Sequence, residues 1–295
     1  MNLLKKFAFG SVAVVGTLSS CINSNSDPIT PLFITDCYTV ATDKLTGEVT
    51  VSTDLSQIIE INWGKDVAQL SFSGFVINNV QYPSMDIFEM KLKYNDWYCN
   101  ADNPIAQFHT GQLADLTNFN YQLNERANNP ELKPGDTFNP YVALVYSFDL
   151  DSRYHIEGSR VPFYFWGTST SVKEGTEPFT SGIKFVTVTP NFENKTVTVE
   201  LPGAQFNQHM LAVLHIQLDD IPMEFIEGGK IITFEKDFLI PSLQGVKADD
   251  YPVYNVKGVL NPAVGLNLEF ECNPNKMGLY KVTTSPTVFG YKTPN

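Results

Sequence analysis

Alternation of apolar and polar residues constrains the fold of this 295-residue chain more than any other feature of its sequence. In the run 87–94, residues 88–94 place apolar and charged side chains at opposite parities, with Phe88, Met90, Leu92 and Tyr94 against Glu89, Lys91 and Lys93. Because side chains of a strand point alternately to the two faces of its sheet, this pattern predicts half-buried antiparallel strands. Helical periodicity is nearly absent after residue 20, and Gly, Pro and Asn separate the alternating runs. The sequence therefore predicts an all-β protein built as β-sandwiches or β-barrels.

Two stretches of the chain are similar to each other at one fixed offset. Residues 37–51 align without a gap with residues 185–199, and the residue types agree at Thr39, Val40, Val49, Thr50 and Val51. Such self-similarity is typical of tandem units, although strands rich in β-branched residues also resemble each other without a common origin. We therefore expect two tandem antiparallel β units, residues 32–170 and 183–295, which an internal duplication would explain. The boundary is expected in the Gly-, Ser-, Thr- and Glu-rich residues 167–182.

The first 21 residues have the pattern of a cleaved secretion signal. Lys5 and Lys6 precede an apolar stretch, Phe7–Leu18, that is too short to cross a bilayer. Leu18-Ser19-Ser20-Cys21 resembles the lipobox of bacterial lipoproteins, and this resemblance implies removal of residues 1–20 and acylation of Cys21 by diacylglycerol and a fatty acid such as palmitate. Residues 21–31 are rich in Asn, Ser and Pro and predict a flexible tether.

With its lipobox, tether and β-rich body, the chain resembles the envelope lipoproteins of Bacteroidetes-type Gram-negative bacteria. Only residues 18–21 carry a specific motif, and the family of the folded body is not identified. The resemblance implies attachment to the outer membrane through the lipid alone, either on the periplasmic face or on the cell surface.

The charge of the chain excludes one class of partner. Its formal net charge is −12, and removal of residues 1–20 deletes Lys5 and Lys6 but no acidic residue. Such an acidic body repels phosphate backbones and anionic lipid surfaces. Nucleic acid is therefore not expected as a partner.

Cysteine usage indicates neither a metal site nor a redox site. After Cys21 the chain has Cys37, Cys99 and Cys272, which allow at most one disulfide, in any of three pairings. None of them forms a C-x-x-C pair, so we predict no metal and no cofactor. Cys272 shares its parity with Phe270, which predicts a buried thiol.

Charged residues alternate between Asp149 and Glu157, with His155 among them. In a single strand, Asp149 and Glu157 would lie roughly 26 Å apart, which is too far for one metal or acid/base site. We therefore interpret the run as a solvated strand face with cross-strand ion pairs. The sequence also lacks a nucleophile elbow, a phosphate-binding glycine loop and a zinc-protease motif, and we predict no enzymatic activity.

Aromatic residues beside polar ones are the remaining candidates for a binding site. The candidates are Trp63, Asp96, Trp97, Tyr98 and Trp166. Tryptophan and tyrosine mixed with acids and amides are typical of ligand sites, and packing in the core of a sheet is the alternative.

The sequence thus favours a lipid-anchored, non-catalytic binding protein of the cell envelope. Its ligand would be a glycan, a small apolar molecule or a partner protein. Two alternatives remain: a structural or assembly component of an envelope complex, joined through exposed strand edges, and a glycan-active enzyme whose carboxylates meet only on folding.

Overall fold

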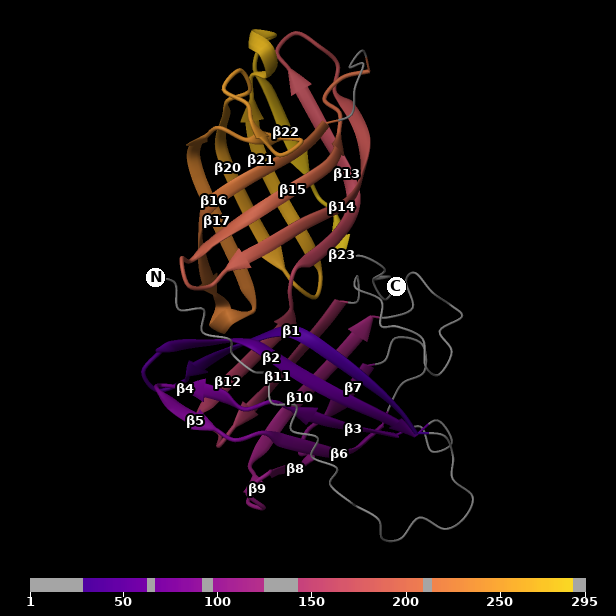
Figure 1. Cartoon of the computed structure of the whole chain (residues 1–295), viewed down its shortest axis with the longest axis vertical. Coiled ribbons are helices and arrows are strands. Elements are labelled where there is room, and N and C mark those ends of the chain that lie inside the picture. Colours follow the sequence, from indigo (N-terminus) through magenta and orange to yellow (C-terminus); the bar gives the residue numbers. More distant parts are fainter. Residues whose placement is uncertain (1–28, 63–66, 92–97, 125–142, 209–213, 289–295) are drawn as a thin grey trace, which may run out of the picture.

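Antiparallel β-strands make up most of the structure, which confirms the predicted all-β class. The computed structural model describes residues 29–62, 67–91, 98–124, 143–208 and 214–288. Two short 3₁₀ segments, η1 (Glu227–Gly229) and η2 (Pro274–Lys276), interrupt the strands, and no α-helix occurs within these ranges. The strands form two units, one above the other in Figure 1.

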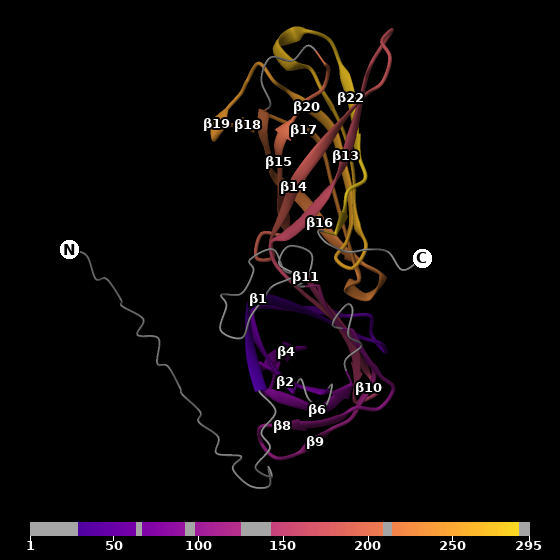
Figure 2. The same cartoon turned by 90° about the vertical axis from the view of Figure 1, so that its right-hand side faces the viewer.

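The first unit is a ten-stranded antiparallel sheet that curls into an open half-barrel (Figures 1 and 2). Its strand order is β7-β10-β11-β12-β1-β2-β3-β6-β8-β9. The strands are β1 (Ile29–Asp43), β2 (Val49–Asn62), β3 (Val67–Phe72), β6 (Met85–Lys91), β7 (Tyr98–Ala101), β8 (Ile105–Phe108), β9 (Leu113–Ala114), β10 (Leu116–Asn124), β11 (Ala143–Leu150) and β12 (Tyr154–Arg160). A separate hairpin, β4 (Phe75–Ile77) with β5 (Val80–Tyr82), contributes the buried Phe75 and Ile77 to the core of this unit.

The second unit is a closed antiparallel barrel. Its eight strands follow the order β14-β13-β22-β21-β20-β17-β16-β15, and the pairing of β15 with β14 closes the ring. They are β13 (Phe163–Lys173), β14 (Phe179–Asn191), β15 (Thr196–Ala204), β16 (Leu214–Ile226), β17 (Ile231–Leu239), β20 (Val253–Asn261), β21 (Gly265–Cys272) and β22 (Tyr280–Thr284). Three short strands attach to it: β18 (Ser242–Leu243), β19 (Val246–Lys247) and β23 (Thr287–Val288).

Each unit buries its own hydrophobic core, as the alternation of residues predicts. In β21 every second residue points into the barrel, so Leu266, Leu268, Phe270 and Cys272 are all buried. The predicted burial of the Cys272 thiol is confirmed, and burial raises its pKa to about 12. Cys37 and Cys99 are also buried, and none of these three cysteines forms a disulfide.

A bulge changes the phase of strand β6 relative to the expected alternation. Glu89 has a positive φ of 54°, and the pairing with β3 shifts between Leu70↔Ile87 and Ala68↔Met90. Ile87 and Met90 are therefore both buried, whereas Phe88 is only half-buried. The prediction that Phe88 and Met90 share one buried face is wrong, because the extra residue of a bulge reverses the faces of the strand.

The chain passes from the half-barrel to the barrel between Arg160 and Phe163, earlier than the expected 167–182 boundary. Residues 163–173 form β13, which pairs with β14 and β22 of the barrel. Ser169 and Ser171 are buried there, and Ser171 Oγ donates a hydrogen bond to the Phe206 carbonyl oxygen at 2.6 Å. The expected boundary is too late because the Ser and Thr residues of β13 give this strand the amino-acid composition of a linker.

The two similar stretches fold as hairpins with equivalent pairing. Val40 pairs with Val51 in β1–β2, and Val188 pairs with Val199 in β14–β15, at the same offset as in the alignment. The hairpins therefore share strand, turn and register, while one sheet stays open and the other closes. Duplication of the whole unit stays a prediction.

The base of the barrel packs on the outer face of β1. The Tyr38 ring lies 4.8 Å from the ring of Phe192 and 6.0 Å from that of Phe163, measured between ring centroids. Val40 is fully buried and belongs to the same core cluster as the barrel residues. Thr42 Oγ1 donates a hydrogen bond of 3.1 Å to the carbonyl oxygen of Gly228 in η1. The half-barrel and the barrel are thus joined by a packed apolar contact.

Candidate functional site

The outer face of strands β10, β11 and β12 forms the floor of the candidate site. Alternate residues of these strands, such as Tyr121 and Tyr146, point into the half-barrel core. The residues between them point outward, and strand pairing places Asn120, Ser147 and Glu157 side by side in one row. Neighbouring strands lie about 4.8 Å apart, so the row offers one polar side chain at each such step.

A second row lies next to the first on the same outer face. Gln122 pairs with Val145, and Val145 pairs with Ser159 of β12. Ser159 in turn pairs with Tyr38 of β1, whose ring packs against the barrel. The floor therefore runs from the exposed side of the sheet to the contact between the two units.

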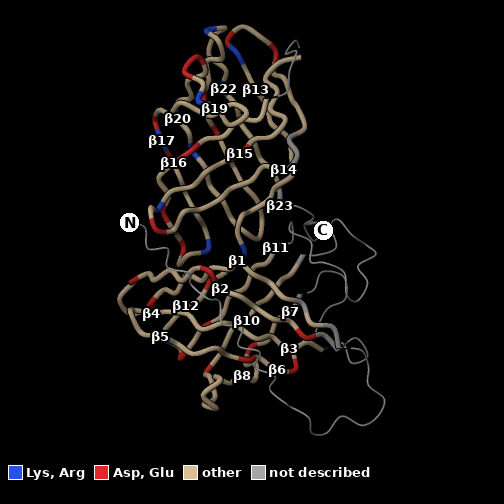
Figure 3. Tube along the Cα trace, in the orientation of Figure 1, with Lys and Arg blue, Asp and Glu red and all other residues tan. Residues whose placement is uncertain are grey.

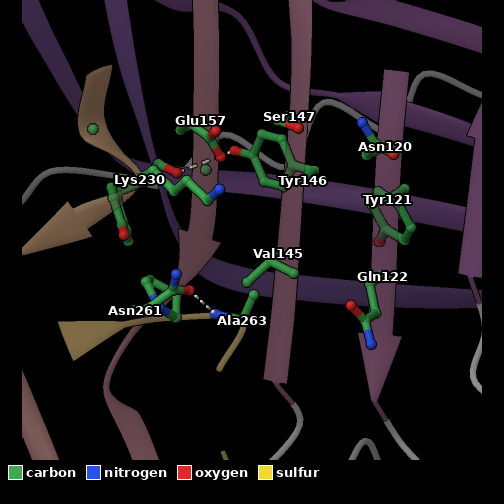
Figure 4. Close-up of a pocket in the computed structure, with 14 residues that line it drawn as sticks. Asn120, Tyr121, Gln122, Val145, Tyr146, Ser147, Glu157, Lys230, Asn261 and Ala263 are labelled. Atoms are coloured by element: carbon green, nitrogen blue, oxygen red, sulfur yellow. Dashed lines mark hydrogen bonds between the residues drawn. The ribbon is translucent and has the colours of Figure 1, made fainter. Parts of the chain in front are cut away.

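Loops at the base of the barrel form the opposite wall. Lys230 follows η1, and Asn261 begins the turn between β20 and β21 (Figure 4). The Asn261 side chain accepts a hydrogen bond of 2.9 Å from the Ala263 backbone N–H, which fixes this turn. The hollow between floor and wall measures about 220 Å³. We call it the interdomain groove, lined principally by Asn120, Gln122, Ser147, Glu157, Lys230 and Asn261.

A histidine orients the acidic residue of the interdomain groove. His155 Nε2 lies 3.0 Å from Glu157 Oε1, and His155 Nδ1 lies 2.9 Å from Asp149 Oδ1. The hydrogen bond with Glu157 raises the pKa of His155; partial burial opposes this rise, and Asp149 adds to it. The imidazolium form, in which both ring nitrogens donate, fits between two carboxylates.

Asp149 is the carboxylate of this cluster with the most hydrogen-bond donors around it. Burial opposes its ionisation, but hydrogen bonds from Asn118, His155 and Lys44 outweigh that effect and lower its pKa. Asn118 Nδ2 donates at 2.8 Å, and Lys44 Nζ lies 3.1 Å from Asp149 Oδ2. Asp149 therefore stays ionised and holds the second ring nitrogen of His155.

The convergence of Asp149, His155 and Glu157 corrects the geometry expected from the sequence. Residues 148–157 are not one strand: β11 ends at Leu150, and β12 begins at Tyr154. The intervening turn has positive φ at Asp151 and Ser152, and it brings Asp149 opposite His155. The expected cross-strand ion pairing is present, but the separation of roughly 26 Å between Asp149 and Glu157 is wrong.

Two of the five predicted aromatic-site residues lie within the described ranges. Tyr98 belongs to β7 and pairs through its backbone with Gln122, next to the interdomain groove. Trp166 is 46% exposed on β13, where it pairs with Thr287, and Thr287 pairs with Gly265 at the end of the β20–β21 turn. Trp63, Asp96 and Trp97, like Cys21, lie outside the described residues.

Sequence reasoning missed Asn120, Gln122 and Ser147, because isolated amides and hydroxyls on a strand carry no motif. Their parity was readable, since each alternates with a large aromatic or aliphatic neighbour. Their common location was not, because it depends on the pairing of strands and on the docking of the barrel.

No group of three or more His, Cys, Asp or Glu side chains in the described ranges is arranged to hold a metal ion. A second hollow of about 430 Å³ lies at the far end of the barrel, beside Lys173, Phe206 and Tyr280. It is lined by the barrel alone, whereas the interdomain groove combines both units.

None of the helices formed by the described residues has the length and apolar character needed to cross a membrane.

Comparisons with known proteins give little further information. No protein-family model matches the chain, and no curated protein matches its sequence. Among solved structures, the chain is similar to a double mutant of transferrin binding protein B, a vaccine antigen of Haemophilus parasuis, with 8% sequence identity and a TM-score of 0.22. The match covers 88% of this chain and 76% of the other.

Proposed function

We propose that this chain is a lipid-anchored binding protein of the cell envelope and that the interdomain groove receives its ligand. The observation that carries this proposal is the hollow of about 220 Å³ between two packed β units, lined by polar side chains from both. Ligand sites occur preferentially at domain interfaces and use a few well-placed polar groups on a rigid scaffold. Here the floor is a sheet, and the docked barrel fixes the wall.

The anchor part of the proposal rests on the lipobox at residues 18–21 and the polar tether that follows it. Acyl chains on Cys21 would hold the protein at the membrane, while its acidic body is repelled by anionic lipid. Acidic residues outnumber Lys and Arg in the described part of the half-barrel (Figure 3). We expect metabolic labelling with an alkyne fatty acid to tag the wild type and not Cys21→Ala. Equal labelling of both would refute the anchor.

The binding part is tested with a double variant of the groove floor. Gln122→Ala with Ser147→Ala removes two outward side chains, and the core behind them stays intact. We expect a thermal-shift screen of the purified full-length chain, against glycans, peptides and small apolar compounds, to find stabilising ligands that the variant no longer recognises.

The matched control is Gln69→Ala with Ser71→Ala. These residues have the same types and the same half-buried, outward positions, but on β3, away from the groove. Binding that both variants lose, or that neither loses, would exclude the interdomain groove as the site.

Aromatic residues are tested in the same screen. Trp97→Ala and Trp166→Ala should weaken binding if the predicted aromatic residues belong to the site. Unchanged affinity in both variants would restrict the site to the polar residues of the groove.

A further inference from the structure

The interdomain groove presents neutral hydrogen-bonding groups over most of its surface. Gln122 contributes a carboxamide and Ser147 a hydroxyl, and neither side chain has a hydrogen-bond partner among the described residues. Asn261 uses its oxygen within its own turn, which leaves its amide hydrogens as donors. The carboxamide of Gln122, the hydroxyl of Ser147 and the amide hydrogens of Asn261 can thus bind a ligand without first breaking a contact within the protein.

We propose that the ligand of this groove is an oligosaccharide that lies across strands β10, β11 and β12. This inference rests on the proposed function and names its ligand class. A sugar hydroxyl both donates and accepts hydrogen bonds, and so do a carboxamide and a serine hydroxyl. The row Asn120, Ser147 and Glu157 repeats at the spacing of the strands, about 4.8 Å, which is close to the length of one sugar unit in an extended chain.

The floor of the groove disfavours an extended peptide. A peptide that binds as an added strand needs free backbone N–H and C=O groups at a sheet edge. The backbone groups of β11 are occupied on both sides, because β11 pairs with β10 and with β12. Only side chains are available on this face, and they match the hydroxyls of a sugar better than a regular peptide backbone.

The charges of the groove disfavour a strongly ionic ligand. Glu157 supplies one negative group and Lys230 one positive group, so the two largely offset each other. His155 holds one oxygen of Glu157 at 3.0 Å, and the remaining acceptor positions of this carboxylate suit the donors of sugar hydroxyls. Lys230 donates only and suits ring or hydroxyl oxygens.

The test is a glycan microarray probed with the purified full-length chain, followed by calorimetric titration of the best tetrasaccharide and of its monosaccharide. We expect the tetrasaccharide to bind more tightly than the monosaccharide, because it reaches side chains on several strands. Gln122→Ala with Ser147→Ala should weaken the binding about tenfold to thirtyfold, since two hydrogen bonds are lost. Gln69→Ala with Ser71→Ala should leave it within about twofold. Hydrogen exchange of residues 116–124 and 143–160 should slow when the saccharide is added.

The two proposals fail in different ways. If no saccharide on the array binds in a manner that the groove variant weakens, while a peptide or apolar compound does, the saccharide inference is overturned and the binding function stands. If no ligand of any class depends on Gln122 and Ser147, both are overturned.

Discussion

At the scale of single residues, His155 is a titratable group that lies between two carboxylates, Asp149 and Glu157. It faces Glu157 on its own strand β12, Asp149 on β11, and Lys44 beyond Asp149 at the turn after β1. The backbone of Gly228 in η1 approaches it from the barrel. The protonated ring therefore links two carboxylates of the half-barrel beside the contact with the barrel.

This arrangement predicts a pH dependence of stability. The pKa of His155 is raised in the folded chain above its ordinary 6.5, mainly by Glu157. Its contribution to the free energy of unfolding is therefore complete below pH 6.5 and is lost as pH rises through the raised folded-state pKa. We expect His155→Gln to destabilise the chain more at about pH 5.5 than at about pH 8.5. Urea unfolding of both proteins at the two pH values measures this, and an equal or reversed difference would contradict it.

At the scale of strands, a glycine covered by an aromatic ring occurs in both sheets. Gly158 pairs with Tyr146 in the half-barrel, and Gly258 pairs with Phe234 in the barrel. A Cβ at Gly158 would lie 2.1 Å from the Tyr146 ring, and one at Gly258 would lie 2.0 Å from the Phe234 ring. In each pair the aromatic ring occupies the space that a side chain at the glycine position would need. In the half-barrel the Tyr146 hydroxyl also forms a hydrogen bond of 2.8 Å with Thr39 Oγ1.

These glycines should not tolerate alanine. We expect Gly158→Ala to lower the free energy of unfolding by about 1–3 kcal/mol, because the aromatic ring must leave its position. Gly182→Ala is the matched control, since a Cβ there meets no atom within 4 Å and the residue also lies in a strand. Chemical denaturation of the variants is the measurement, and similar losses for Gly158 and Gly182 would show that the ring contact is not the cause.

The sequence predicted strands well where alternation continues without interruption, and it failed where one residue changes the phase. The faces of β21 and the hairpin register of Val40 and Val188 follow directly from the pattern. The bulge at Glu89 and the turn at Asp151 do not, because the polar alternation passes through both without a break. The expected separation of Asp149 and Glu157 is wrong for this reason, and the contact of His155 with both carboxylates was not predicted.

At the scale of the whole molecule, the candidate site exists only because the barrel docks on the half-barrel. No local sequence pattern predicts this docking, because Tyr38 and Val40 have the same alternation as core residues of a single sheet. The aromatic partners of Tyr38, which are Phe163, Phe192 and Phe225, are distant from it in the sequence. The aromatic prediction reached the neighbourhood of the interdomain groove only through Tyr98, the strand partner of Gln122.

Docking of the two units predicts coupled unfolding. Tyr38→Ala removes the ring that contacts Phe163, Phe192 and Phe225, and it should cost about 3–5 kcal/mol, as for other large buried aromatic residues. We expect calorimetry to show one transition in the wild type and two in the variant, one for each unit. A single transition in the variant, shifted to lower temperature, would mean that other contacts suffice to couple the units.

The position of β1 has a mechanical consequence. This strand begins at Ile29, so residues 29–31, expected as the end of the flexible tether, are instead paired with β2. Its later half, from Cys37 to Asp43, pairs with β2 on one side and β12 on the other. Under the proposed anchoring, tension between the membrane and a ligand in the groove would run along β1. The ladders on both sides would then be loaded in shear, so that many hydrogen bonds share the force instead of opening one after another. A protein that must hold a partner against flow or diffusion would gain from being tethered by that strand.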